Sequence, residues 1–210
     1  MITERLARNN PNDIRSQRSL SACLRNVGDV LLKQGNSTEA LNTLLNGIAI
    51  IDRLAKSNPK EMRLRQYLAE NLVGVAEAYR LLGQLSEALT YAQRGVTVIE
   101  GLAKADPDNA LWQWNLSVYY EDVGDVLKAQ GRAEEALASY ERSLDGREKF
   151  MQGHPSSKFI PDNPSNGGTQ GATASVAQLL EKIAALKRTA ESEKFIAKSQ
   201  EEVKRLSAKP

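Results

Sequence analysis

Few residues in this chain have the types and spacing that chemistry would need. His154 is the only histidine and Cys23 the only cysteine among 210 residues. His154 precedes Pro155, just as Asn58 and Asp106 precede prolines, which predicts a turn or helix-end role. A nucleophilic thiol needs an adjacent base, and Cys23 has no evident one, so a packing role is expected. The sequence therefore predicts no catalytic residue and no enzyme.

Motifs for cofactors, metals and nucleic acids are missing as well. Gly167, Gly168 and Gly171 follow no predicted strand and lack the Lys-Ser/Thr ending of a phosphate loop. No His/Cys cluster has metal-ligand spacing, so neither a cofactor nor a metal is expected. A net charge of +2 argues against generic nucleic-acid binding. No apolar run approaches the roughly 20 residues that span a bilayer, and no secretory leader is visible. We expect a cytoplasmic protein with no membrane or nucleic-acid partner.

The dominant feature is an internal repeat of 48 residues. Prolines recur with this period at Pro11, Pro59, Pro107 and Pro155. Glycines keep the same period at Gly35, Gly83 and Gly131. A fixed period of 20–50 residues is typical of solenoids, in which each repeat buries its neighbour's apolar face.

Each copy has the pattern of two helices. The first helices are expected at about 13–34, 61–82 and 108–130, each followed by a glycine suited to a left-handed C-cap. The second helices are expected to start near Thr38, Ser86 and Glu134 and to end before the Asn/Asp-Pro pair. Short connections make neighbouring helices antiparallel. The predicted class is all-α, with repeats at 11–58, 59–106 and 107–155.

One motif in each copy resembles a known family. The pattern Gly-x6-Gly-x4-Ala is similar to the tetratricopeptide repeat, and it occurs as Gly28…Gly35…Ala40, Ala76…Gly83…Ala88 and Gly124…Gly131…Ala136. The usual unit has about 34 residues. Here each helix gains seven, as in the long-helix arrays of large bacterial multidomain proteins. The resemblance implies a right-handed α-solenoid of antiparallel helix hairpins.

The same resemblance implies a partner-binding groove along the first helices. Its positions in this sequence are Arg18, Arg25, Asp29, Gln66, Glu70, Val73, Glu77, Arg80, Trp114, Val118, Glu121, Asp125 and Lys128. These residues form an acidic stripe with scattered arginines, which favours a ligand with basic residues. The alternative interpretation is that the charges only solvate this face.

The two tryptophans are predicted to differ. Trp112 aligns with Leu64 and is expected to pack between helices. Trp114 aligns with the polar Gln66 and Arg18, so its helical phase points toward the groove, where an exposed Trp often anchors an interface. Burial of Trp114 against the neighbouring second helix is nevertheless the favoured interpretation.

The ends of the chain differ from the repeats. Residues 1–10 align with the end of a second helix, which indicates a preceding or capping helix and a chain that starts inside a repeat. Residues 156–175 contain Pro and Gly and are expected to form a flexible linker. Residues 176–206 are expected to form an amphipathic helix. It either caps repeat three or pairs with another chain or domain, and the acidic repeat three beside a basic tail favours docking.

The sequence thus predicts a non-catalytic protein-protein interaction scaffold that binds a peptide or helix of a partner in the groove. The alternative is a structural spacer or regulatory segment of a larger multidomain signalling protein, with no ligand of its own. Self-association through the repeat ends or through the C-terminal helix is a further expectation.

Overall fold

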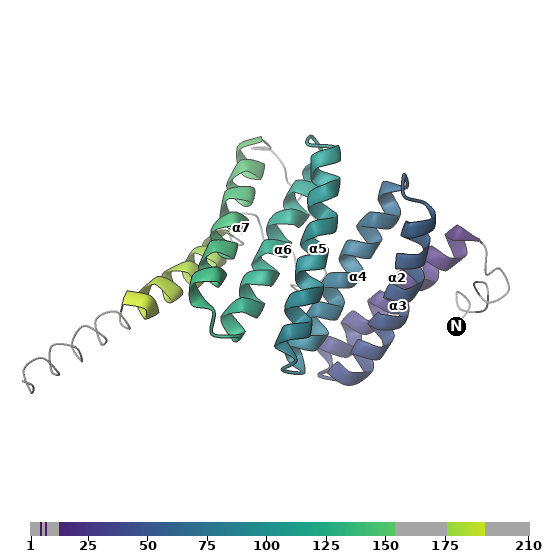
Figure 1. Ribbon diagram of the computed structural model, residues 1–210, viewed down its shortest axis with the longest axis horizontal. Helices are drawn as coiled ribbons and strands as arrows, with labels where there is room; N and C mark the ends of the chain where they lie inside the picture. The colour runs from purple at the N-terminus through teal and green to yellow at the C-terminus, as the bar shows by residue number, and fades with distance from the viewer. Residues whose placement is uncertain (1–4, 6, 8–12, 154–175, 192–210) are drawn as a thin grey trace, which may run out of the picture.

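The protein is a row of antiparallel helices (Figure 1). The computed structural model describes residues 5, 7, 13–153 and 176–191. Its labelled helices are α2 (Ile14–Lys33), α3 (Ser37–Ser57), α4 (Met62–Leu81), α5 (Leu85–Ala105), α6 (Ala110–Ala129) and α7 (Ala133–Gly153). Residues 176–191, here called the C-terminal helix, lie at the α7 end of the row. These residues contain no strand, so the prediction of an all-α solenoid is confirmed.

Several sequence predictions concern residues outside the described ranges. They are His154, the linker at 156–175, residues 192–206 of the tail and most of the segment 1–10. Ala7 of that segment is described; it is 1% exposed, and its carbonyl accepts a hydrogen bond from Gln17 Nε2 at 2.9 Å. No helix in the described ranges is long and apolar enough to cross a membrane.

The glycine that ends each first helix is required by its backbone. Gly35, Gly83 and Gly131 have φ angles of 80°, 74° and 75°, which confirms the predicted left-handed C-cap. After α2, the Gly35 N–H donates to Leu32 O at 3.0 Å and the Asn36 N–H to Leu31 O at 2.9 Å. This pair of bonds is the Schellman motif. The same motif recurs after α4 and α6. The three repeats therefore use the same turn between their first and second helices.

The helices form two layers. Within each repeat the first and second helix pack together, and each second helix also packs against the next first helix. In addition, α2 contacts α4, and α4 contacts α6, more than successive second helices contact one another. The first helices α2, α4 and α6 therefore form the inner layer of the stack, where a groove is expected.

The apolar core runs between these layers. Leu44, Ile51, Leu64 and Leu72 are at most 1% exposed and belong to one cluster at the first two repeats. A second cluster extends from α4 to the C-terminal helix and includes Trp112 and Tyr140. Each hairpin thus buries its apolar side against a neighbour, as a solenoid requires.

The two helices of a hairpin approach closely at the small residue of the repeat motif. A Cβ on Gly28 would lie 2.5 Å from Leu44 Cγ, and one on Gly124 would lie 2.5 Å from the Tyr140 ring. The equivalent pair in repeat two is Ala76 and Ala92, both buried. In each repeat a small residue on the first helix thus allows the second helix to pack closely at this point.

We expect Gly28→Ala to destabilise the array by about 1–3 kcal/mol, because its new methyl group overpacks Leu44. The double variant Gly28→Ala, Leu44→Ala copies the pair found in repeat two. Its loss of unfolding free energy, measured by urea denaturation, should be smaller than the sum of the two single losses. Additive losses would contradict this close contact.

Candidate functional site

A cavity of about 310 Å³ opens between the inner helices α2, α4 and α6. We call it the groove cavity. Its lining combines carboxylates with apolar and basic side chains. The carboxylates are Asp29, Glu77, Asp122 and Asp125, the larger apolar residues are Leu32, Val73, Leu81 and Val126, and the basic residues are Lys33 and Arg80.

The repeat motif itself brings three of these carboxylates together. Asp29, Glu77 and Asp125 each follow the small residue that contacts the second helix of the same hairpin. The next residue lies about 100° further round the helix, so its side chain turns away from that contact and toward the groove. Stacking of the repeats then aligns one carboxylate from each.

Most cavity carboxylates have a cationic partner. Asp29 Oδ2 accepts from Arg25 Nη2 at 3.3 Å. Glu77 binds Arg80 through both oxygens, at 2.6 and 2.7 Å. Asp122 differs, because its Oδ2 is buried and has no hydrogen-bond partner among the described residues. A buried polar atom without a partner is rare and calls for an explanation.

Burial makes two of these carboxyls harder to ionise. Burial raises the pKa of Asp122 well above its ordinary value, and the negative charges of Glu121, Asp125 and Glu77 add to the effect. Burial also raises the pKa of Asp29, although Arg25 and Lys33 oppose that rise. The cavity therefore favours positive charge, which would stabilise the ionised carboxylates.

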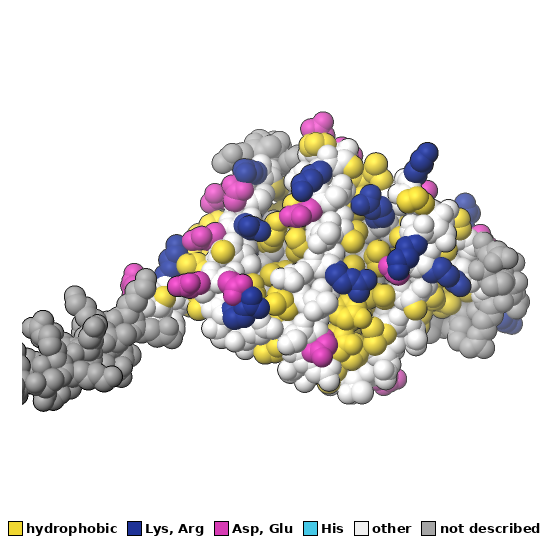
Figure 2. Space-filling view, viewed as in Figure 1, with side chains coloured by type: hydrophobic (Ala, Val, Ile, Leu, Met, Phe, Trp, Pro, Cys, Tyr) yellow, Lys and Arg dark blue, Asp and Glu magenta, His cyan; other side chains and the backbone are white. Residues whose placement is uncertain are grey.

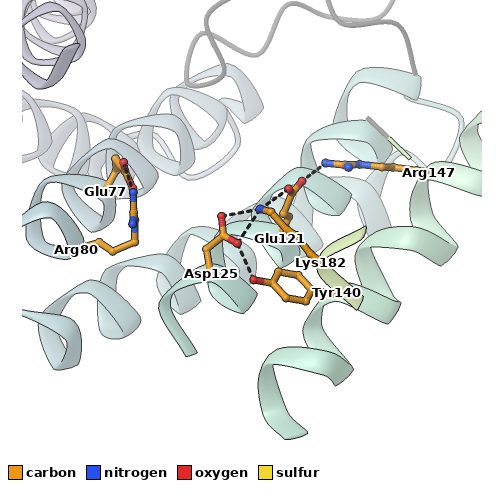
Figure 3. Close-up of polar contacts among 7 residues, drawn as sticks. All are labelled: Glu77, Arg80, Glu121, Asp125, Tyr140, Arg147 and Lys182. Atoms are coloured by element: carbon orange, nitrogen blue, oxygen red, sulfur yellow. Dashed lines mark hydrogen bonds and ion pairs between the residues drawn. The ribbon is translucent and has the colours of Figure 1, made fainter. Parts of the chain in front are cut away.

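The C-terminal end of the groove holds a network of five side chains (Figure 3). Lys182 Nζ donates to Glu121 Oε1 at 2.7 Å and to Asp125 Oδ1 and Oδ2 at 2.7 and 2.8 Å. Tyr140 Oη donates to Asp125 Oδ1 at 2.6 Å, and the buried Arg147 donates to Glu121. Burial alone would lower the pKa of Lys182, but the charges of Glu121 and Asp125 outweigh it and raise that pKa.

The C-terminal helix supplies Lys182 and packs on repeat three. Its Leu179, Ile183 and Leu186 are 0%, 6% and 8% exposed and belong to the cluster that contains Tyr140 and Phe150. Residues 176–191 therefore dock on α6 and α7, as the charge difference between tail and repeat three predicts.

The structure places five of the predicted groove residues in the groove cavity. They are Asp29, Val73, Glu77, Arg80 and Asp125. All belong to the inner helices α2, α4 and α6, and four of the five are charged. Whether they bind a partner stays a prediction.

Arg25, Glu70, Val118 and Glu121, and in part Val73, are used in contacts between neighbouring helices. Arg25 Nη1 donates to Glu70 Oε2 at 3.0 Å across α2 and α4. Val73 and Val118, the equivalent residues at the next junction, share one buried cluster. Glu121 is 8% exposed because Arg147 and Lys182 cover it. Neighbouring first helices approach each other on this face, which a single helix's periodicity does not reveal.

The remaining predictions are Arg18, Gln66, Trp114 and Lys128. The Arg18 guanidinium lies 5.6 Å from the centroid of the Tyr67 ring, and Gln66 Oε1 accepts from Trp112 Nε1 at 3.3 Å, so both contact the following repeat or helix. Lys128 is exposed and does not line the groove cavity.

Trp114 is buried, as the favoured interpretation predicts, and its placement among the groove residues is wrong. Trp114 is 3% exposed and packs edge-on against Phe150 of α7, at 5.1 Å between ring centroids. Its neighbour is therefore the second helix of the same repeat. Trp112 is 7% exposed, which confirms its predicted packing between helices.

Asp122 is the residue that sequence reasoning missed. It lies three positions before Asp125 on α6, and residues three apart share a helix face. That spacing was the available signal. Cys23 is half-buried, in line with its expected packing role. In the described part of the chain, no group of three or more His, Cys, Asp or Glu could hold a metal ion.

The fold and site define a helical repeat array with a charged inner groove, and comparison with known proteins agrees. Residues 116–156, which cover most of α6 and all of α7, match the family model described as tetratricopeptide repeat. This segment is similar to a tetratricopeptide repeat, and with the 48-residue register the match supports an array of such repeats. The sequence has no significant match among curated proteins.

Two solved structures show similarity. The crystal structure of BtubC (BKLC) from P. vanneervenii is 12% identical, with a TM-score of 0.53 over 99% of this chain and 88% of that chain. It supports the helical repeat fold alone. The MamA RS-1 ArsTM double mutant is 14% identical over 82% of this chain and 97% of that chain, and its TM-score of 0.24 carries no argument.

We expect Asp122→Asn to stabilise the array at pH 8 by about 1 kcal/mol or more, because it removes the charge from a carboxyl whose buried Oδ2 has no hydrogen-bond partner among the described residues. The pKa of Asp122 is higher in the folded than in the unfolded chain. Its ionisation therefore costs stability above that folded pKa, and the cost disappears as the pH falls toward 3.8.

The check is urea unfolding from pH 4 to pH 8, with Asp108→Asn as the matched control, since Asp108 is exposed. The free energy of unfolding of Asp122→Asn should exceed that of the wild type by an amount that grows with pH. The free energy of unfolding of Asp108→Asn should equal that of the wild type at each pH. A destabilised Asp122→Asn variant at pH 8 would contradict the account.

Proposed function

We propose that this array binds a peptide or helix of a partner protein in the groove cavity, and that a basic side chain of the partner pairs with Asp122. The observation that carries the proposal is the buried Asp122 Oδ2 without a hydrogen-bond partner. The tetratricopeptide match and the helical repeat fold support an interaction scaffold in general.

The charges of the cavity support a cationic group. Asp29, Glu77 and Asp125 already have Arg25, Arg80 and Lys182, respectively, while Asp122 has none among the described residues. A single ammonium or guanidinium group would neutralise Asp122 and lower its raised pKa. An uncompensated carboxylate at this place costs stability, which fits a residue kept for binding.

The lining supports a protein segment rather than a nucleic acid. Leu32, Val73 and Val126 offer apolar contact beside the carboxylates, as binding clefts commonly do. Phosphates require a basic track, which the cavity carboxylates oppose. The face shown in Figure 2 has acidic and basic side chains scattered among apolar ones, without a continuous basic patch.

The long-helix subtype, a non-catalytic role and cytoplasmic localisation belong to this proposal and stay predictions. The helices of 20 or 21 residues suit the subtype. The all-helical repeat fold is the kind of structure that typically serves interaction rather than catalysis.

Affinity capture with the full chain tests the function. The wild type, Asp122→Asn and Asp108→Asn are used as baits, and captured proteins are quantified by mass spectrometry. We expect a set of proteins that wild type and Asp108→Asn capture equally and that Asp122→Asn captures at least several-fold less. Because Asp122→Asn is expected to be the more stable protein, unfolding would not explain its loss of binding.

Equal capture by all three baits would contradict a role for Asp122. Empty captures from all of them would favour the structural spacer.

A further inference from the structure

The C-terminal helix binds repeat three through one apolar stripe. Leu179, Ile183 and Leu186 are spaced four and three residues apart, so they share one helix face. All three are buried in the cluster that includes Trp114 and Phe150. This is the geometry by which an amphipathic helix occupies a groove on another protein.

A lysine inside that stripe is matched by two acids. Lys182 lies one residue before Ile183, and its Nζ contacts Glu121 and Asp125 within 2.8 Å. The same Nζ lies 5.5 Å from the centroid of the Tyr140 ring. An apolar or acidic residue in its place would leave Asp125 without a cation and Glu121 with Arg147 alone, beside the buried Asp122. The surface therefore selects a basic side chain at this position (Figure 3).

This surface differs from the two junctions inside the array. At the position that Glu121 occupies in α6, the earlier first helices have Arg25 and Val73. Arg25 pairs with the acid Glu70, and Val73 shares an apolar cluster with Val118. Only the last junction combines an acid on the array with a base on the incoming helix. A helix that binds this face of α6 and α7 must therefore place a basic residue opposite Glu121 and Asp125.

The C-terminal helix is described over residues 176–191. Leu180, on its outer side, is 47% exposed, so the described residues cover only one face of this helix. Its described contacts with the array include three buried apolar residues, the bonds of Lys182 and a surface pair between Lys187 and Glu141 at 3.1 Å.

We propose that the face of α6 and α7 under the C-terminal helix is an exchangeable helix-docking site. This chain's own helix occupies it until a partner helix with the same pattern replaces it. The partner helix carries a lysine with apolar residues at positions −3, +1 and +4 relative to that lysine. The proposal does not rest on binding in the groove cavity. Displacement of Lys182 would, however, free Asp125, which also lines that cavity.

A synthetic peptide of residues 176–191 with a fluorescent label is the probe, because it carries the required pattern. It is titrated with the full chain as wild type, as Leu179→Asp and as Leu180→Asp. Leu179→Asp places a charge in the buried stripe and releases the internal helix, whereas Leu180→Asp makes the same change on the exposed side. An internal competitor acts at an effective concentration of roughly millimolar. We therefore expect Leu179→Asp to bind the peptide at least tenfold tighter than wild type and Leu180→Asp do.

Two further variants keep the test decisive. Lys182→Glu in the full chain replaces the lysine with an acid that Glu121 and Asp125 repel, so this variant should also release the internal helix. It provides a second opened chain in case Leu179→Asp disturbs the fold of repeat three. A peptide with Lys182→Glu should bind the opened chains at least tenfold more weakly than the unchanged peptide. This loss would show that the lysine is recognised.

Three outcomes would overturn the proposal. One is failure of both opened chains to bind the peptide while circular dichroism shows repeat three intact. Another is equal affinity of wild type and opened chains. The third is a wild-type dimer in sedimentation that Leu179→Asp abolishes, because the site would then serve a second copy and not a partner.

Discussion

The contact between successive first helices is the constraint on which the rest of this structure depends. A single hairpin cannot bury its apolar face, so each hairpin must stack on the next. Stacking brings α2 against α4, and α4 against α6, on the inner side of the array. One face of each first helix must therefore serve both the junction and the groove. Arg25 and Glu70 are used in the junction, and Asp29 and Glu77 remain to line the cavity.

The inner carboxylates oppose the stability that stacking provides. Asp122 lies beside Glu121 and Asp125, and burial removes the water that would screen them. Arg147 and Lys182 offset part of this repulsion. The array thus combines a stable apolar core with a local electrostatic cost at one place. Such local conflicts within an otherwise consistent sequence are typical of functional sites.

The sequence predicts the helices well because their signals are local. Gly35 and its equivalents end the first helices through a backbone angle that other residues adopt with difficulty. The groove residues were predicted less well. The phase of a residue on its helix gives the direction of its side chain, but it does not tell which side chains of neighbouring helices cover that residue. Trp114 aligns with the polar Gln66 and Arg18, yet it is 3% exposed and packs against Phe150. Asp122 was missed because its isolation depends on how three helices come together.

A carbon-detected NMR titration of the aspartate side-chain carboxyls tests the central claim most directly. The claim is that stacking buries Asp122 among other acids, where the charge of Lys182 only partly offsets their repulsion. The account predicts that the Asp122 carboxyl titrates well above the ordinary value of 3.8. It also predicts that this midpoint falls when a basic partner segment binds. A midpoint near 3.8 in the free protein would show a solvated carboxylate and would contradict an enclosed cavity.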